Sequence, residues 1–245
     1  MSASIVTDVP LDREVVVAVP WPKEEYYMMQ LSIIVPVLNE ATTLVCFLES
    51  LKKTLSITHS EIIVVDGGSQ DNTVSLAQTL VDKVLLSEKG RAKQMNLGAK
   101  NATGKTLLFL HSDTFFPVVN EVSVNEVFPF ISQPVKWGFY PIRLSGRHFL
   151  FRVIERMMNV RSRLTSVATG DQCFFVDKVF FDSCGGFSDI PLMEDVELSK
   201  RLRRYGSPYI PPIKVITDSR RWEKNGILTT VVLMWYLRAL YFFCV

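Results

Sequence analysis

The 245-residue sequence predicts an α/β fold with a mostly parallel sheet flanked by helices. From Leu31 onward, short β-branched apolar runs alternate with longer amphipathic segments, as in parallel strands joined by crossover helices. Apolar residues make up 48% of the chain, which is enough for one substantial core. Polar clusters follow three of the apolar runs, and open α/β sheets bind ligands where their strands end. We therefore expect a single domain with its ligand site at the carboxyl edge of the sheet.

The first half of the chain shows this alternation most clearly. We expect strands over residues 31–36, 61–66, 84–86 and 105–110, and helices over 40–53, from 71 onward and over 90–99. Asn39 precedes the first of these helices and is placed to cap it. The first half is thus predicted to form a Rossmann-like, nucleotide-binding part of the domain.

The second half is less regular and is predicted to belong to the same domain. We expect strands over 137–144 and 172–177, and helices over 147–160 and 195–205. The domain would then run over residues 31–226. Residues 227–245 are almost wholly apolar and predict a carboxyl-terminal helix.

Residues 1–30 show no helical period, because Pro10, Pro20 and Pro22 interrupt their short apolar run. We expect a poorly ordered extension, and an edge strand over 14–19 is the alternative. The segment also lacks the basic start and long apolar run of a secretory signal. These features predict a cytoplasmic protein, at the inner face of the plasma membrane if it meets a membrane.

Charge and cysteine content exclude several classes of protein. The chain has 27 Lys plus Arg against 25 Asp plus Glu, a near balance that argues against a dedicated nucleic-acid binder. Its four cysteines are far apart and form no Cys-x-x-Cys pair, which argues against a zinc site and a disulfide framework. Any anionic ligand must therefore be held by local groups.

The first polar cluster is Val-Pro-Val-Leu-Asn-Glu, residues 35–40. A strand ends there and passes to a helix with Glu40 in its first turn, so the segment can form a hydrogen-bonding pocket. The alternative is that Asn39 and Glu40 are helix caps and nothing more.

The second cluster surrounds Asp66, which follows four apolar residues at the end of a predicted strand. Its carboxylate can accept hydrogen bonds from a base or a ribose. Gly67 and Gly68 allow a ligand to approach the backbone closely. Asp71 and Asn72 are sufficiently explained as the start of the next helix.

The third cluster, His-Ser-Asp at residues 111–113, follows the strand of residues 105–110. Side chains two apart on an extended segment point the same way, so His111 and Asp113 can both face one divalent cation. Mg²⁺ or Mn²⁺ that accompanies a diphosphate binds through one or two carboxylates, phosphate oxygens and water. A packed or outer-sphere imidazole is the alternative for His111.

In this order and spacing, the three clusters resemble the family 2 glycosyltransferases of the GT-A fold. The resemblance covers most of the chain after residue 30, and the matching segments together look like a bacterial subgroup of uncharacterised relatives. It implies that the second half forms the acceptor side of the domain. It extends to Gly-Arg-Ala-Lys-Gln-Met-Asn at 90–96, Thr-Gly-Asp-Gln-Cys-Phe-Phe at 169–175, Met-Glu-Asp-Val-Glu at 193–197 and Arg-Arg-Trp-Glu at 220–223.

The resemblance implies a nucleotide pocket, a phosphate contact and a metal site. The pocket would be lined by Pro36, Val37, Asn39, Glu40, Asp66, Gly67, Ser69 and Ser112, with Asp66 on the base. Arg91 or Lys93 would approach a phosphate. The family usually has Asp-x-Asp where this chain has His111-Ser-Asp113, so only the second carboxylate is retained.

The resemblance also implies the catalytic groups. Asp195 looks like the general base that deprotonates an acceptor hydroxyl for in-line attack with inversion, and Glu194 is its neighbour. A merely charged first turn of a helix is the alternative. Arg220 and Arg221 would neutralise diphosphate oxygens while Trp222 stacks on an acceptor or closes the site; otherwise they form a solvated basic loop with a half-buried indole.

These features predict transfer of a sugar from a nucleoside diphosphate donor, a UDP- or GDP-sugar, to a hydroxyl acceptor. One alternative is a catalytically inactive nucleotide-binding or membrane scaffold protein. The other is a sugar-nucleotide nucleotidyltransferase, which would carry a glycine-rich, lysine-containing loop where this chain has Val-Leu-Asn-Glu at 37–40.

Two segments suggest membrane contact. Residues 147–163 mix five arginines with apolar residues, as in an interfacial or anion-facing helix, or in a helix packed on the core with a solvated basic face. Residues 227–245 are consistent with a helix buried on the domain, an in-plane membrane helix or a membrane span. A peripheral membrane contact would then be made through residues 227–245.

Overall fold

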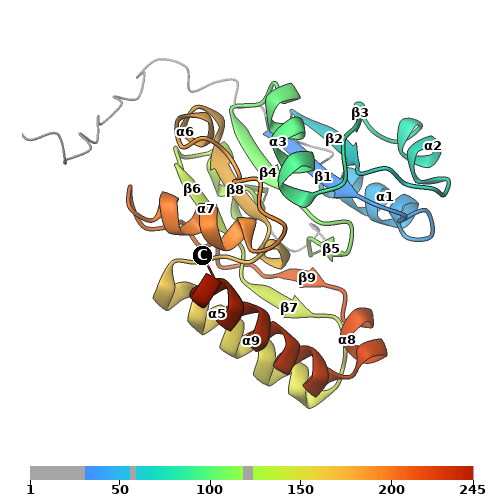
Figure 1. Cartoon of the computed structure of the whole chain (residues 1–245). Helices are drawn as coiled ribbons and strands as arrows, with labels where there is room; N and C mark the ends of the chain where they lie inside the picture. Colours follow the sequence, from blue (N-terminus) through green and yellow to red (C-terminus); the bar gives the residue numbers. More distant parts are fainter. Residues whose placement is uncertain (1–30, 56–58, 118–123, 245) are drawn as a thin grey trace, which may run out of the picture.

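The computed structural model describes residues 31–55, 59–117 and 124–244, shown in Figure 1. The predicted extension over residues 1–30 lies outside them. The main sheet has the strand order β3-β2-β1-β4-β8-β6. These strands are β1 Leu31–Val37, β2 Ser60–Asp66, β3 Lys83–Leu86, β4 Thr106–Phe109, β6 Trp137–Phe139 and β8 Phe174–Asp177. Strands β3, β2, β1 and β4 are parallel and β8 is antiparallel to both its neighbours, which confirms the mostly parallel α/β sheet.

Strand β1 lies at the centre of the core because helices cover both faces of the sheet. All seven of its residues are buried, as expected for a parallel strand with no solvated face. Ile33 and Val35 face the cluster that contains α1, whereas Ile34 faces the cluster that contains α3. Helix α3 approaches the sheet closely, since a Cβ on Gly98 would lie 2.4 Å from Ile34 Cγ2. Glycine is therefore required at this crossing.

The helices along the chain include those predicted in the first half, with shifted bounds. They are α1 Leu44–Leu55, α2 Thr73–Gln78, α3 Arg91–Asn101, α4 Val124–Val127, α5 Phe149–Thr165, α6 Lys178–Ser183, α7 Glu194–Leu202, α8 Arg220–Asn225 and α9 Ile227–Cys244. The described residues also form two short 3₁₀ helices, η2 Pro129–Ile131 and η3 Gly170–Gln172. Helix α1 begins four residues later than predicted, because residues 41–43 form a turn.

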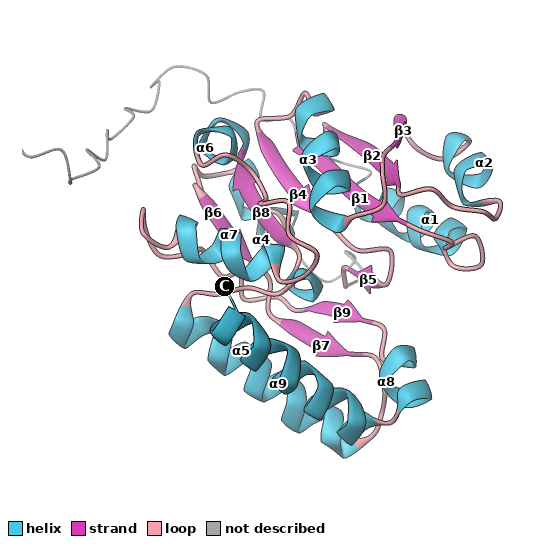
Figure 2. Ribbon diagram, viewed as in Figure 1, coloured by secondary structure: helices cyan, strands magenta, loops and turns pink. Residues whose placement is uncertain are grey.

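A second, three-stranded sheet lies between the main sheet and the helices α5 and α9, as Figure 2 shows. Its strands are β5 Thr114–Phe115, β7 Ile142–Leu144 and β9 Val215–Thr217, in the order β5-β9-β7. The single strand predicted over 137–144 is wrong, because β6 and β7 belong to different sheets. Pro141 separates them; it has no N–H to continue a ladder.

Helices α5 and α9 both pack on the core at the end of the molecule below β7 in Figure 1. Helix α9 contributes Ile227, Val231 and Met234 to this packing. Within the part of the chain that the structure describes, no helix is both long and apolar enough to cross a bilayer.

Candidate active site

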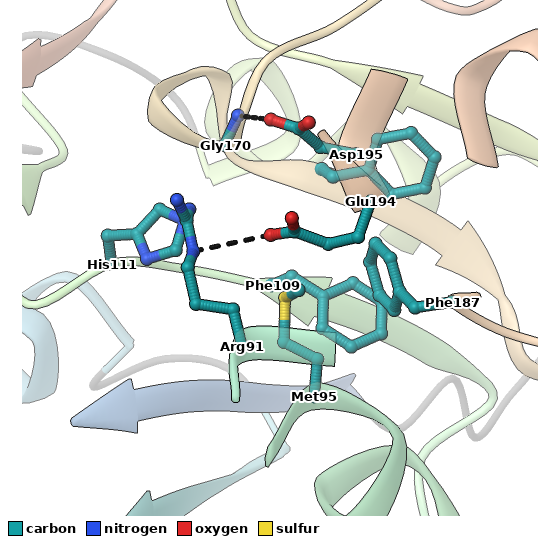
Figure 3. A pocket seen from close by; sticks show the side chains of 9 residues that line it. Arg91, Met95, Phe109, His111, Gly170, Phe187, Glu194 and Asp195 are labelled. Atoms are coloured by element: carbon teal, nitrogen blue, oxygen red, sulfur yellow. Dashed lines mark hydrogen bonds and ion pairs between the residues drawn. The ribbon is translucent and has the colours of Figure 1, made fainter. Parts of the chain in front are cut away.

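A small pocket lies between the start of α3, the segment after β4 and the start of α7 (Figure 3). Its lining residues are Arg91, Met95, Phe109, His111, Gly170, Phe174, Phe187, Glu194 and Asp195. Four residues predicted from three separate motifs therefore meet here: Arg91, His111, Glu194 and Asp195. The fold brings together a cation, an imidazole and two carboxylates at the carboxyl end of β4.

Arg91, the first residue of α3, connects the other polar groups of the pocket. Its Nε lies 3.3 Å from Glu194 Oε1, and its Nη2 donates to His111 Nε2. A Cβ on Gly170 would lie 2.2 Å from Arg91 Nη2 and 2.7 Å from His111 Nε2. Gly170 thus leaves room for the guanidinium to reach both partners.

Glu194 and Asp195 begin α7, directly after Met193 in the left-handed conformation with φ 66°. Asp195 Oδ2 accepts from Gly170 N, and its Oδ1 accepts from Val196 N at 2.7 Å. Glu194 is buried, and its Oε1 has the ion pair with Arg91 but no hydrogen bond.

The surroundings of these two carboxylates change how readily they bind a proton. Burial raises the pKa of Asp195, and the charge of Arg91 opposes the rise. Burial also raises the pKa of Glu194; Arg91 again opposes, whereas the neighbouring Asp195 adds to the rise. A carboxylate with a raised pKa in a cleft is a better general base near neutral pH than an ordinary surface carboxylate.

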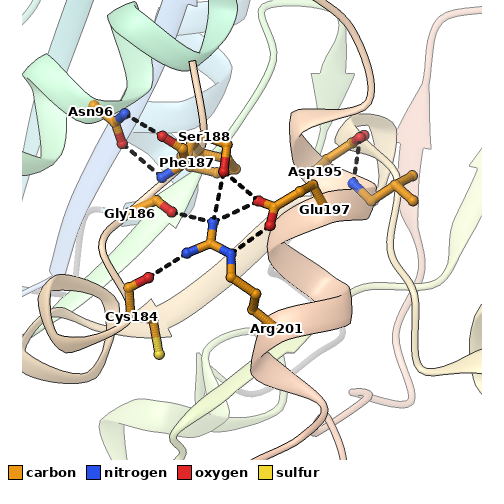
Figure 4. Close-up of polar contacts among 9 residues, drawn as sticks. Asn96, Cys184, Gly186, Phe187, Ser188, Asp195, Glu197 and Arg201 are labelled. Atoms are coloured by element: carbon orange, nitrogen blue, oxygen red, sulfur yellow. Dashed lines mark hydrogen bonds and ion pairs between the residues drawn. The ribbon is translucent and has the colours of Figure 1, made fainter. Parts of the chain in front are cut away.

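Phe187 lines the pocket from a loop that is held at two points (Figure 4). Asn96 of α3 accepts from Phe187 N at 2.9 Å and donates to Phe187 O at 2.7 Å. Arg201 donates to Gly186 O and Glu197 Oε2, each at 2.6 Å, which ties the loop to α7. The position of the aromatic ring beside the carboxylates therefore depends on both helices.

The predicted nucleotide loops lie side by side because β1 and β2 pair in register, with Val37 opposite Asp66. Asp66 is buried and orders its own loop: its Oδ2 accepts from Gly68 N and Ser69 N, both at 2.9 Å, and its Oδ1 accepts from Ser69 Oγ. Asp66 therefore fixes the backbone that would meet a nucleotide.

Asn39 does not cap a helix, so that interpretation is wrong. Its backbone has φ 56°, its N–H donates to Ser69 Oγ at 2.8 Å, and its Oδ1 accepts from Gln70 N at 2.8 Å. Glu40 N donates to Thr73 Oγ1 at 2.9 Å in the same manner. The two loops are thus joined into one surface by side chains that the sequence presents as separate motifs.

Gln94 is a site residue that sequence reasoning missed. It is buried on the sheet-facing side of α3, and its Nε2 donates to Val37 O at 2.9 Å and to Val65 O at 2.7 Å. A Cβ on Gly67 would lie 2.9 Å from Gln94 Oε1, so this glycine makes room for the amide. A polar residue between the buried Ala92 and Met95 was the signal that could have revealed it.

The remaining nucleotide-site predictions are placed as follows. Pro36 and Val37 are buried at the end of β1, and Ser112 is buried in the turn between β4 and β5. Lys93 pairs with Glu88 at 2.6 Å and lies 3.9 Å from Asp189, so it does not line the pocket. Of the two predicted phosphate contacts, Arg91 is the one at the pocket.

The predicted metal pair is only partly compatible with the geometry. His111 Nε2 accepts from Arg91, so in this arrangement that nitrogen is not open to a cation. Asp113 is partly exposed, and its Oδ1 accepts from Thr114 Oγ1 at 3.3 Å. Among the described residues, no group of three or more His, Cys, Asp and Glu side chains could hold a metal ion.

The segment of Arg220 and Trp222 is a helix, α8, and the loop interpretation is wrong. Arg220 is exposed and pairs with Asp218 at 2.5 Å. Trp222 is 8% exposed and belongs to the hydrophobic core, so its indole does not line the pocket. The side chain of Arg221 is outside the described part of the structure.

The family model described as glycosyl transferase family 2 matches residues 32–118. An uncharacterized glycosyltransferase of Rickettsia prowazekii is 35% identical over 109 residues, which cover 42% of this chain and 33% of the relative. A dolichyl-phosphate beta-glucosyltransferase of Drosophila melanogaster is 32% identical over 133 residues, 46% of this chain and 41% of the relative. The matches thus span between about a third and two fifths of these curated relatives.

Solved structures show the same architecture. Residues 1–349 of S. aureus TarS superpose with a TM-score of 0.61 and 20% identity, covering 78% of this chain and 61% of that one. A mannosyltransferase of Pyrobaculum calidifontis, in complex with GDP-Man and Mn²⁺, has a TM-score of 0.55 and 20% identity, covering 78% and 57%. The chain therefore has the GT-A fold, and its residues 32–118 are similar to glycosyltransferase family 2.

Proposed function

We propose that the protein transfers a sugar from a nucleoside diphosphate donor to a hydroxyl acceptor, with inversion at the anomeric carbon. The observation that carries this proposal is the meeting of Glu194, Asp195 and Arg91 in one pocket at the carboxyl end of β4. A base and a diphosphate-neutralising cation are the two groups that such a transfer requires. Solved neighbours hold GDP-Man or UDP-GlcNAc, which supports a donor of this class.

In the proposed step, Asp195 takes the proton of the acceptor hydroxyl. The acceptor oxygen then forms its bond to the anomeric carbon, on the face opposite the bond to the diphosphate oxygen that breaks. The nucleoside diphosphate leaves with the electron pair of that bond. Arg91 is placed to stabilise its negative charge, and Glu194 holds Arg91 by their ion pair.

The nucleotide would bind over the joined loops that follow β1 and β2. The carboxylate of Asp66 would accept a hydrogen bond from the base in addition to those from its own loop. Asn39 would hold the adjoining turn in place. Backbone at Gly67 and Ser69 would border the ligand. Arg220 and Arg221 belong to α8, so they would approach the diphosphate from this helix. Trp222 would not take part, because it is packed in the core.

The residues present fit a divalent cation in part. Asp113 would be its protein ligand, with phosphate oxygens and water as the others, whereas His111 Nε2 already accepts from Arg91. When bound, the cation would supply charge neutralisation for the diphosphate. A neighbour that holds Mn²⁺ together with GDP-Man supports this assignment.

We propose further that the transfer takes place at a membrane surface. Residues 227–245 would contact a membrane peripherally, at the cytoplasmic face. Exposed apolar side chains of α9, Val232 and Leu233 among them, support this contact.

Thermal unfolding in the presence of nucleotides tests the donor site. We expect one nucleoside diphosphate, or its sugar, to raise the unfolding midpoint by about 5–10 °C at a hundredfold excess over its Kd. Mn²⁺ should increase that shift in the wild type and in His111→Gln, but not in Asp113→Ala. A folded protein whose midpoint responds to no nucleotide would instead favour a scaffold without a donor site.

A further inference from the structure

Helix α5 carries a stripe of exposed apolar side chains along its outer face. The residues are Phe149, Val153, Met157, Val160 and Leu164, all at least 48% exposed. Their spacing of three or four residues places them on one side of the helix. Leu164 is 81% exposed and Phe149 is 68% exposed, so neither is covered by the rest of the described chain. A contiguous apolar stripe of this length on a surface indicates an interaction site.

The exposed charge along this stripe is entirely positive. Arg156 and Arg163 are exposed and lie seven residues apart, beside the apolar positions on the helix surface. Glu155, the acidic residue of α5, is buried, and its Oε2 lies 3.2 Å from Arg152 Nη1. The interpretation of this helix as packed on the core with a solvated basic face is therefore incomplete, since most of the outer face is apolar.

Helix α9 lies at the same end of the molecule as α5 in Figure 2, and it carries further exposed apolar side chains. Val232, Leu233 and Tyr236 are each more than half exposed. Its sequence, residues 227–244, contains no Asp or Glu. Acidic side chains are thus missing from the outer faces of both helices, among the residues whose side chains the structure describes.

We propose that the outer face of α5, together with the exposed side chains of α9, docks in plane on an anionic lipid bilayer. The apolar stripe would enter the boundary between headgroups and acyl chains, and the arginines would pair with anionic headgroups. This partner is complementary to the face in both respects. A second copy of the chain fits less well, because a symmetric pairing would bring Arg156 and Arg163 of the two copies together.

Vesicle flotation tests this proposal with the full chain. We expect binding to vesicles of phosphatidylcholine with phosphatidylglycerol, weaker binding to phosphatidylcholine alone, and loss of binding as salt is raised. The double variant Arg156→Gln/Arg163→Gln should bind the anionic vesicles about 25-fold more weakly, since each basic residue near such a surface contributes about fivefold. Leu164→Asp should reduce binding by about tenfold or more.

Val179→Asp is the matched control. Val179 is 70% exposed on α6, at the opposite end of the molecule in Figure 1, and its substitution should leave vesicle binding unchanged. Equal binding to neutral and anionic vesicles, or none by the folded wild type, would overturn the proposal. The proposal would also be overturned if the wild type forms dimers that the Leu164→Asp substitution dissociates, and binds no vesicles. The nucleotide-induced rise in unfolding midpoint should be the same in Leu164→Asp and wild type, which separates this surface from the donor site.

Discussion

Asp195→Asn is expected to lower the turnover number by about 10²- to 10⁴-fold, with the Kd for the donor nucleotide nearly unchanged. The reason is that an amide cannot accept the acceptor's proton, whereas the nucleotide loops after β1 and β2 do not contact this residue in any described hydrogen bond. Transfer of sugar measured at saturating donor, together with nucleotide binding by calorimetry, checks both parts.

The control for this substitution is Asp182→Asn, which changes the same functional group at an exposed position on α6. It should leave turnover and binding unchanged. Because Asp195 accepts from Gly170 N and Val196 N, the unfolding midpoint of Asp195→Asn must be measured as well. Full turnover by a folded Asp195→Asn would remove this residue from the base position, whereas nucleotide binding without any turnover by the wild type would favour the inactive scaffold.

The pH dependence of turnover follows from the same carboxylate. A base works only when deprotonated, so activity should fall as the pH drops through its pKa, which burial raises. Arg91 opposes that rise, so Arg91→Gln should move the acid limb of the profile to higher pH. The measurement is turnover against pH at saturating donor for both proteins. An unchanged acid limb would show that Arg91 does not act on the titrating group.

The second large effect is expected from Gln94→Leu, which should lower the free energy of unfolding by about 2–5 kcal/mol. Leucine removes both hydrogen bonds of the buried amide and leaves the carbonyls of Val37 and Val65 without that donor. These carbonyls lie at the ends of β1 and β2, so nucleotide affinity should fall too.

Denaturant unfolding and nucleotide calorimetry measure the two consequences. Gln78→Leu is the matched control, because Gln78 is exposed at the end of α2 and should tolerate the same change. If Gln94→Leu is as stable as Gln78→Leu, the amide does not hold the strand ends together. If it is destabilised but binds nucleotide normally, its effect is confined to the fold.

The nucleotidyltransferase alternative is not favoured by the first loop. The turn after β1 contains Leu38, Asn39 and Glu40, and side chains of the β2–α2 segment occupy its backbone donors. A phosphate-cradling loop would instead leave such N–H groups to the ligand.

Local sequence patterns determined the elements of the first half and the places where their strands end. Buried parallel strands are continuous apolar runs, so 31–36, 61–66 and 105–110 could be recognised without knowing their partners. The polar residue after each run marks the carboxyl edge of the sheet. Asp66 and the segment of His111 were therefore found as candidates from the sequence, and Asp195 through its resemblance to a family motif.

Tertiary structure decided which of these residues meet. Arg91 reaches Glu194 and His111, whereas Lys93, two positions later on the same helix, points to Glu88 and Asp189. Residues two apart on a helix face different directions, so motif proximity alone could not choose between them. Which of the two side chains reaches the pocket depends on how α3 crosses the sheet. Gly98 permits this crossing because it lets the helix lie close to Ile34.

Three further features were decided only by the tertiary structure. They are the burial of Trp222, the division of 137–144 between two sheets, and the exposed stripe of α5. Each depends on packing between segments distant in the chain. An amphipathic pattern predicts that a helix has an apolar side. Whether a given apolar residue is buried depends on whether another part of the fold packs against it. Helix α5 has apolar residues on two sides, and the core of this domain covers one of them.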